Sequence, residues 1–300
     1  MIRYTVIGGW LGSGKTTLIN RLLASTPPDG ERIAVIVNDV GEINVDAALI
    51  RSRGTETIEL TNGCVCCSIG GSLAITLRDL VRGDGRLGHR APDRIIVEAS
   101  GVADPAKVAG YGDRRVLRLD GVVVTVDCVD LERRLADETY GPMVRHQIDT
   151  ADVLVATKTD LATPKQLLAA HDWCRANVRD TPVVEFADLV DTFAMERSMS
   201  SMPSVGSKLA PQLSLVSRTW RPDGAVDIEA VLRELADLGI VRAKGIIRDL
   251  DGVRQLVQHT DGAGSQVLAT EADVPEGLVL IATSHDLDAF FVAMPGSGSR

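Results

Sequence analysis

The stretch that decides the fold is Gly8-Gly9-Trp10-Leu11-Gly12-Ser13-Gly14-Lys15-Thr16-Thr17. Read from Gly9, it matches the phosphate-loop pattern G-x-x-x-x-G-K-[ST] at every fixed position. An apolar run, Tyr4–Ile7, precedes it, and a helix-like pattern, Leu18–Leu23, follows it. A strand before and a helix after are what this motif requires. We therefore interpret the stretch as a phosphate loop and not as a plain glycine-rich turn.

The chemistry of such a loop explains its spacing. Glycines let successive backbone N–H groups point at phosphate oxygens, and the start of the next helix adds its positive end. The Lys15 amine can reach the β- and γ-phosphates, and the Thr16 hydroxyl can hold Mg²⁺. The residues expected to bind the phosphates are Gly9, Gly12, Ser13, Gly14, Lys15, Thr16 and Thr17.

Length and composition limit the class of protein. The chain has 300 residues, of which 45% are hydrophobic and 24% charged, the balance of a globular protein. A net charge of −9 argues against non-specific binding to nucleic acid or to anionic membranes. No apolar stretch approaches the roughly 20 residues that a membrane span needs, and the first strand leaves no room for a signal peptide. We therefore expect a cytoplasmic protein.

Strand and helix patterns alternate over the first two thirds of the chain. Strands are expected near residues 3–8, 33–37, 94–98, 121–127 and 153–157, with a possible strand at 57–60 and a short one around 183–184. Helices are expected near residues 15–25, 72–82, 129–149 (with a break at Gly141-Pro142) and 164–178. This alternation predicts an α/β P-loop NTPase domain over residues 1–197, with a mainly parallel, doubly wound sheet.

The pattern changes after that domain. Residues 198–212 are rich in Ser and Pro and are interpreted as a linker. Strand patterns on both sides of an Asp251-Gly252 turn, and a helix near 227–238, predict a smaller α+β domain over residues 213–295 with antiparallel strands. The Gly- and Ser-rich residues 296–300 are expected to be a flexible tail.

The segment Thr157-Lys158-Thr159-Asp160 indicates which base the bound nucleotide carries. It resembles the [N/T]KxD guanine motif, in which the Asp carboxylate accepts hydrogen bonds from guanine N1–H and the exocyclic amine. The Lys stem lies along the base, and adenine cannot make the same pair. Lys-x-Asp after a strand is often a surface turn, but after a strand of a P-loop domain it favours guanine.

Carboxylates follow two other strand patterns. Glu98 ends the strand near 94–98 and can hold Mg²⁺ through water, and the N–H of Gly101 can sense the γ-phosphate. Asp39, Glu42 and Asp46 follow the strand near 33–37. They can position Mg²⁺ or the attacking water, or join a metal site, although each one alone is more often a surface residue.

The chain has five cysteines, and three of them, Cys64, Cys66 and Cys67, lie within four residues. Thiolates are soft ligands that suit Zn²⁺ or Cu⁺. A tetrahedral site needs a further ligand, from Asp39, Glu42, a water or a second chain. A redox-sensitive or structural cysteine group is the alternative, but the clustering favours metal. The other two cysteines, Cys128 and Cys174, lie in apolar patterns and are expected to be core thiols.

In this order the motifs resemble the CobW-like family of metal-handling P-loop GTPases. The resemblance rests on Gly9–Thr17, Asn38–Glu42 with Asp46, Asn62–Cys67, Glu98–Pro105, Thr157–Asp160 and, in the second domain, Arg242–Arg248. The chain departs from the usual pattern at three places. It has Trp10 where the family commonly has Phe, Ser13 where Ala is common, and Asp39-Val40 where Glu-Phe is usual.

The resemblance implies a slow GTPase that binds a transition metal and delivers it to a client metalloprotein. Family members act in zinc homeostasis, cobalamin biosynthesis and nitrile hydratase activation. GTP and Mg²⁺ are the implied cofactors, with Zn²⁺, or else Co²⁺ or Fe²⁺, as the metal, and a homodimer is left open. The expected catalytic residues are Lys15, Thr16, Asp46 and Glu98. The guanine-nucleotide site adds Gly101, Thr157, Lys158 and Asp160, and the transition-metal ligands are Cys64, Cys66, Cys67, Asp39 and Glu42.

Two other functions compete with this one. A small-molecule P-loop kinase would leave the guanine motif unexplained, and the sequence shows no clear Arg-rich lid. A nucleotide-gated scaffold or redox sensor would use the cysteines as oxidisable thiols. Two measurements would separate them: turnover of GTP without an acceptor would argue against the kinase, and stoichiometric metal in the reduced protein, lost when Cys66 and Cys67 are replaced with Ser, would argue against the sensor.

Overall fold

The computed structural model describes residues 1–25, 32–37, 56–59, 69–82, 91–112, 116–178, 181–185, 189, 215–262, 264–271 and 275–299. The chain divides into two compact units. The first contains a parallel sheet and the second an antiparallel sheet, and each is described by itself.

The parallel sheet has β1 at its centre. Its strands are β1 (Ile2–Gly9), β2 (Ile33–Val37), β3 (Glu56–Glu59), β4 (Arg94–Glu98), β5 (Leu117–Asp127), β6 (Val153–Thr157) and β7 (Val183–Val184). Their order is β3-β2-β4-β1-β5-β6-β7, and every pairing is parallel. Val6 and Ile7 of β1 are fully buried, because a strand in a doubly wound sheet is covered on both faces.

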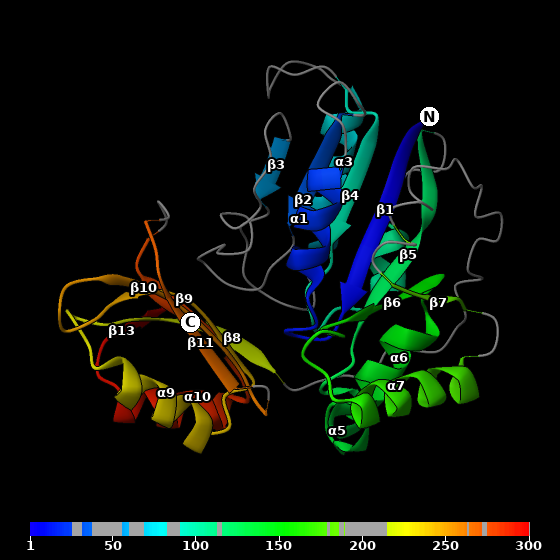
Figure 1. Cartoon of the computed structure of the whole chain (residues 1–300). Coiled ribbons are helices and arrows are strands. Elements are labelled where there is room, and N and C mark those ends of the chain that lie inside the picture. Colours follow the sequence, from blue (N-terminus) through cyan, green and yellow to red (C-terminus); the bar gives the residue numbers. More distant parts are fainter. Residues whose placement is uncertain are drawn as a thin grey trace. The chain divides into compact units, whose positions relative to one another are not determined.

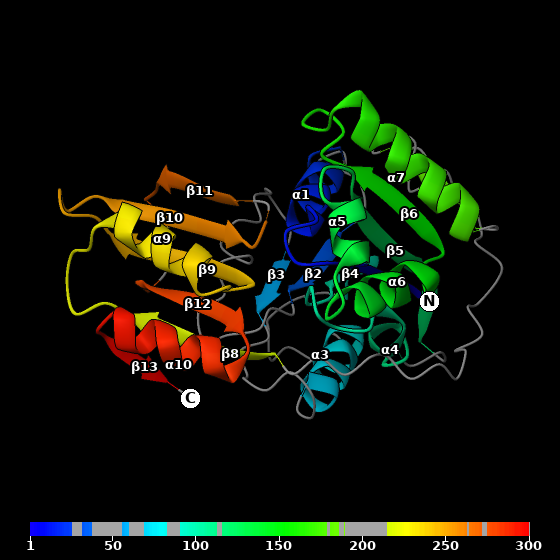
Figure 2. The same ribbon diagram turned by 90° about the horizontal axis from the view of Figure 1, so that it is seen from below.

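Helices cover both faces of this sheet. They are α1 (Lys15–Ser25), α3 (Ile69–Arg82), α4 (Pro105–Ala109), α5 (Leu131–Ala136), α6 (Gly141–Asp149) and α7 (Pro164–Asn177). α1 and α7 lie on one face, and α3 and α4 lie on the other (Figure 2). The expected break at Gly141-Pro142 separates α5 from α6. The predicted α/β P-loop architecture is confirmed.

Four strands end at one edge of the sheet, and this edge positions the functional site. The register pairs Ile7 with Glu98, Gly9 with Thr125, and Asp127 with Thr157. Because parallel strands share a direction, the segments that follow them emerge together. The phosphate loop, the carboxylate of β4 and the guanine motif are therefore neighbours in space.

The second unit is an antiparallel sheet covered by two helices (Figure 1). Its strands are β8 (Val216–Arg221), β9 (Arg242–Arg248), β10 (Arg254–Thr260), β11 (Gly264–Ala269), β12 (Gly277–Ala282) and β13 (Ser297–Ser299), in the order β11-β10-β9-β12-β8-β13. The helices are α9 (Ile228–Asp237) and α10 (Ser284–Ala293). The rings of Trp220 and Phe290 pack edge to face at 5.5 Å between sheet and helix. The predicted α+β class is confirmed.

The structure differs from the sequence expectation at the end of the chain. The Gly- and Ser-rich tail was expected to be flexible, yet Ser297–Ser299 pairs with β8. Backbone hydrogen bonds to an edge strand do not depend on side-chain type, so composition alone misjudged this segment. The linker predicted at 198–212 lies outside the described residues. None of the described helices has the length and apolar character to cross a membrane.

Candidate functional site

The phosphate loop has the backbone that its glycines predict. Gly9, Gly12 and Gly14 have φ values of 129°, 75° and 91°, in the left-handed region that side chains disfavour. Ser13 is buried, and its hydroxyl lies 2.6 Å from the Thr125 hydroxyl on β5. The Ser13 side chain therefore anchors the loop to the sheet, while Thr17 lies exposed on the first turn of α1.

Lys15 and Thr16 lie where the motif requires them. The Lys15 amine donates to the carbonyls of Gly9 (3.0 Å) and Trp10 (3.1 Å), so it lies across the loop. The Thr16 hydroxyl lies 3.0 and 3.2 Å from the two carboxylate oxygens of Glu98. A hydroxyl beside a carboxylate offers the hard oxygen ligands that Mg²⁺ prefers. The structure thus brings Thr16 and Glu98 together, and Lys15 lies across the loop that precedes Thr16.

The guanine motif is attached directly to the phosphate loop. The Thr157 hydroxyl donates to the Ser13 carbonyl at 2.8 Å. Lys158 has φ 55°, and its amine pairs with the Asp127 carboxylate at 2.6 Å. Asp160 lies exposed in the turn that follows. The predicted guanine motif and the phosphate loop therefore form one connected edge.

Gly101 packs against the phosphate loop. A Cβ atom at this position would lie 2.7 Å from the backbone nitrogen of Leu11, so only glycine allows the segment after β4 to come so close. Gly101 is buried. The position expected to sense the γ-phosphate therefore touches the loop that would hold that phosphate.

Six predicted site residues lie outside the described residues: Asp39, Glu42, Asp46, Cys64, Cys66 and Cys67. Across the described ranges there is no group of three or more His, Cys, Asp or Glu side chains suited to a metal ion.

Cys128 and Cys174 are free and buried, and burial raises the pKa of each thiol to about 11. They are core thiols, as expected from their apolar surroundings.

The sequence reasoning missed two polar residues next to this edge. Asp127, at the end of β5, holds the amine of Lys158. Its signal was available, because it ends a strand with a carboxylate just as Glu98 does. Gln147, buried in α6, donates to the carbonyls of Gly101 and Ala103. A single glutamine in a helical pattern gives no comparable signal in the sequence.

Comparison with known proteins places the chain in a family. The model of the CobW/HypB/UreG nucleotide-binding domain matches residues 3–185. The zinc chaperone YjiA of Escherichia coli K12 is 33% identical over 262 residues, which cover 82% of this chain and 80% of YjiA. The zinc chaperone CobW of Sinorhizobium is 34% identical over 197 residues, 56% of this chain and 54% of CobW.

Among solved structures, the Zn(II)-bound triple mutant of the GTPase YjiA matches 97% of each chain at 23% identity, with a TM-score of 0.44. The fold assignment rests on the sheet topology and the family match. That match spans more than half of the chain and contains the phosphate loop, Glu98 and the guanine motif. The chain therefore belongs to the CobW/HypB/UreG family of P-loop GTPases, as the order of its motifs predicts.

Proposed function

We propose that this protein is a GTP-hydrolysing metallochaperone that binds a transition metal at Cys64, Cys66 and Cys67 and delivers it to a client metalloprotein. Zinc is the proposed cargo, because thiolates suit it and because the relatives YjiA, CobW and YeiR are named zinc chaperones. Asp39 and Glu42 are the proposed additional ligands.

The observation that carries this proposal is the assembled edge of the parallel sheet. Thr16 lies within hydrogen-bond distance of Glu98 there, Lys15 lies across the phosphate loop, and Thr157 fastens the predicted guanine motif to the same loop. Along the chain, the Cys-x-Cys-Cys motif lies in the connection from β3 to α3. β3 pairs with β2, and β2 pairs with β4, which ends at Glu98. The strand that precedes the Cys-x-Cys-Cys motif in the chain therefore belongs to the same sheet as the strands that end at the nucleotide edge.

The residues of this edge have distinct proposed roles. Lys15 and the start of α1 bind the phosphates, while Asp160 and Lys158 select guanine. Thr16 and Glu98 suit Mg²⁺, which when bound neutralises charge on the β- and γ-phosphates. Asp46 positions the water that attacks the γ-phosphate, and the products are GDP and phosphate. The Gly101 N–H detects whether the γ-phosphate is present, so hydrolysis changes the segments that lead to the metal ligands.

A metal titration tests the proposal. The reduced protein is titrated with Zn²⁺, Co²⁺ and Fe²⁺ in three states: with Mg²⁺ and a non-hydrolysable GTP analogue, with GDP, and without nucleotide. We expect one metal per chain and an affinity that differs about tenfold or more between the analogue and GDP states, a coupling within the usual range. Equal affinity in all three states would contradict the coupling of GTP to metal.

Matched variants separate the metal site from the other thiols. Cys66→Ser with Cys67→Ser should abolish stoichiometric binding, whereas Cys128→Ser and Cys174→Ser should leave it unchanged, because those thiols are buried in the core. Hydrolysis of GTP without any added acceptor distinguishes the GTPase from a small-molecule kinase. If the double variant still bound one metal per chain, the Cys-x-Cys-Cys site would be wrong.

A further inference from the structure

Helix α6 holds the segment that follows β4 at three points. The side-chain amide of Gln147 donates to the carbonyls of Gly101 (3.0 Å) and Ala103 (2.9 Å). The neighbouring His146 lies 3.1 Å from Asp104, which caps the start of α4. Gln147 is only 1% exposed. Both of its donor hydrogens are therefore committed to fixing the backbone around Gly101.

The start of the same helix touches the phosphate loop. The ring of Trp10 packs against that of Tyr140, the residue before α6, at 5.4 Å. On the other side, the Arg134 guanidinium of α5 lies 6.0 Å from the Trp10 ring and is held by Asp130 at 2.7 Å. The α5–α6 pair thus contacts both the phosphate loop and the segment that bears Gly101.

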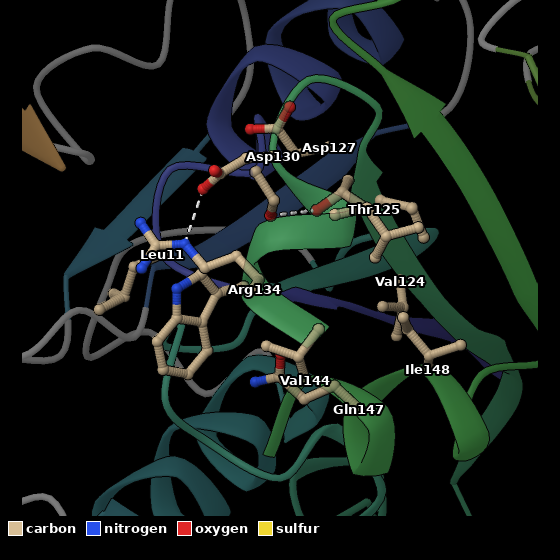
Figure 3. Close-up of a pocket in the computed structure, with 13 residues that line it drawn as sticks. Leu11, Val124, Thr125, Asp127, Asp130, Arg134, Val144, Gln147 and Ile148 are labelled. Carbon is tan, nitrogen blue, oxygen red and sulfur yellow. Dashed lines mark hydrogen bonds and ion pairs between the residues drawn. The ribbon is translucent and has the colours of Figure 1, made fainter. Parts of the chain in front are cut away.

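A small cavity of about 20 Å³ lies between these contacts. Figure 3 shows Arg134 of α5 and Val144 and Gln147 of α6 around it. Trp10 also lines the cavity. Within the described part of the chain, the Trp10 indole N–H and the Gln147 side-chain oxygen are buried without a hydrogen-bond partner. The cavity therefore leaves unfilled space beside the Trp10 ring and the Gln147 side chain.

The Gly101 segment has two close contacts. There is no room for a Cβ between Gly101 and Leu11, and the Gln147 amide binds the Gly101 carbonyl. A displacement of Gly101 away from the phosphate loop must therefore either break the Gln147 bonds or move α6. Because Tyr140 begins that helix, movement of α6 changes the contact with Trp10.

We propose that Gln147 is a positioning residue that sets the Gly101 N–H for the γ-phosphate and passes the nucleotide state through α6 to Trp10. This inference rests on the proposed role of Gly101 as the γ-phosphate sensor. Neither Gln147 nor Trp10 needs to touch the nucleotide. The α5–α6 pair becomes the part of the GTPase unit whose packing reports whether GTP or GDP is bound.

Fluorine NMR of protein labelled with 5-fluorotryptophan tests this directly. The chain has three tryptophans, Trp10, Trp173 and Trp220, and single Trp→Phe variants assign the three resonances. We expect the Trp10 resonance to differ between GDP and the analogue guanylyl imidodiphosphate, each with Mg²⁺. The Trp220 resonance, from the core of the second unit, should stay in place.

Gln147→Met removes both donors at nearly constant side-chain length. In this variant the Trp10 resonance should no longer differ between the two nucleotide states, and kcat should fall about tenfold. The Kd for GDP should change less than about twofold, because the Gly101 segment contributes only when the γ-phosphate is present. Gln166→Met is the matched control. The Gln166 amide also donates to a backbone carbonyl, that of Val129 at 2.9 Å, but from α7. In this control, the difference in the Trp10 resonance and the value of kcat should both stay as in the wild type.

Tyr140→Leu gives a second test that leaves the Gln147 hydrogen bonds intact. In this variant the Trp10 resonance should no longer differ between the GDP and analogue states, and kcat should stay at the wild-type value. The inference is overturned if Gln147→Met binds GDP and keeps both the Trp10 difference and kcat. It is also overturned if wild-type Trp10 gives one resonance position with both nucleotides. A wild-type protein that neither binds nor hydrolyses GTP would instead overturn the proposed function.

Discussion

Thr157 and Lys158 of the predicted guanine motif make two short contacts, one to the phosphate loop and one to the end of β5. The Thr157 hydroxyl reaches the Ser13 carbonyl in the phosphate loop, and the Lys158 amine reaches Asp127 at the end of β5. Asp127 is itself fixed, because its other oxygen accepts from the Val129 N–H at 3.0 Å. Lys158 is the one described residue other than glycine with a positive φ. Its backbone and its amine are therefore both constrained before any base is bound.

Asp127→Asn tests this constraint at the residue scale. The amide removes the charge that holds the Lys158 amine, so the lysine stem is no longer oriented along the base. We expect the Kd for GDP to rise about three- to tenfold, in line with roughly 1 kcal/mol for a partly exposed charged contact. Fluorescent-GDP titration measures it. Asp149→Asn, an exposed position on α6, is the control, and equal affinities for the two variants would contradict the role of Asp127.

At the scale of elements, periodicity located the buried strands and most helices. It missed β11 and α10 for different reasons. β11 is mostly exposed, so it carries no strong apolar pattern, and it forms because β10 offers it a partner. α10 had a local signal, since Thr283 accepts from the Asp286 N–H and bonds its carboxylate, a helix-start pattern. Thr283 follows the last residue of β12 directly, so this helix begins where the apolar strand pattern ends.

His259 connects several of these elements and makes the second unit sensitive to pH. Its ring lies 2.8 Å from the Ser265 hydroxyl on β11 and 3.1 Å from the Ile240 carbonyl before β9. Burial lowers the pKa of His259 from its usual value of 6.5. The unfolded chain therefore binds a proton more readily than the folded unit does as the pH falls below about 6.5. The free energy of unfolding should be constant above that pH and decrease below it.

Chemical denaturation between pH 7.5 and pH 5 measures this effect. His259→Gln should lower the free energy of unfolding at pH 7.5 and flatten its decrease below pH 6.5. His285→Gln, at an exposed position on α10, should reproduce the wild-type curve. A His259→Gln curve with the full wild-type slope would show that another group causes the pH dependence.

At the scale of the whole molecule, the two units have separate cores and separate sheets. The described residues proposed to bind the nucleotide end or follow β1, β4 and β6 of the parallel sheet. Ligand binding stabilises only the structure that unfolds together with its site. The two units should therefore respond differently to nucleotide.

Hydrogen exchange with and without GDP checks this expectation. At a GDP concentration one hundred times its Kd, amides of β1 and β5 that exchange by unfolding should gain about 2.7 kcal/mol of protection. Amides of β9 and β12 should gain little. Equal gains in both sheets would mean that the units unfold as one cooperative block.

The sequence alone determined the phosphate loop, the guanine motif, the parallel sheet and the family, because each depends on local residue types at fixed spacing. Only the tertiary structure decided which distant side chains support them. Gln147 reaches Gly101 from 46 positions away in the chain, and Asp127 at the end of β5 reaches Lys158 just beyond the neighbouring strand β6. Such contacts depend on strand order and helix packing. These bring distant residues side by side, but the spacing of the residues in the sequence does not reveal which ones become partners. The loop beginning at Gly9 is thus readable as a phosphate site by itself, while its supports become visible only in the fold.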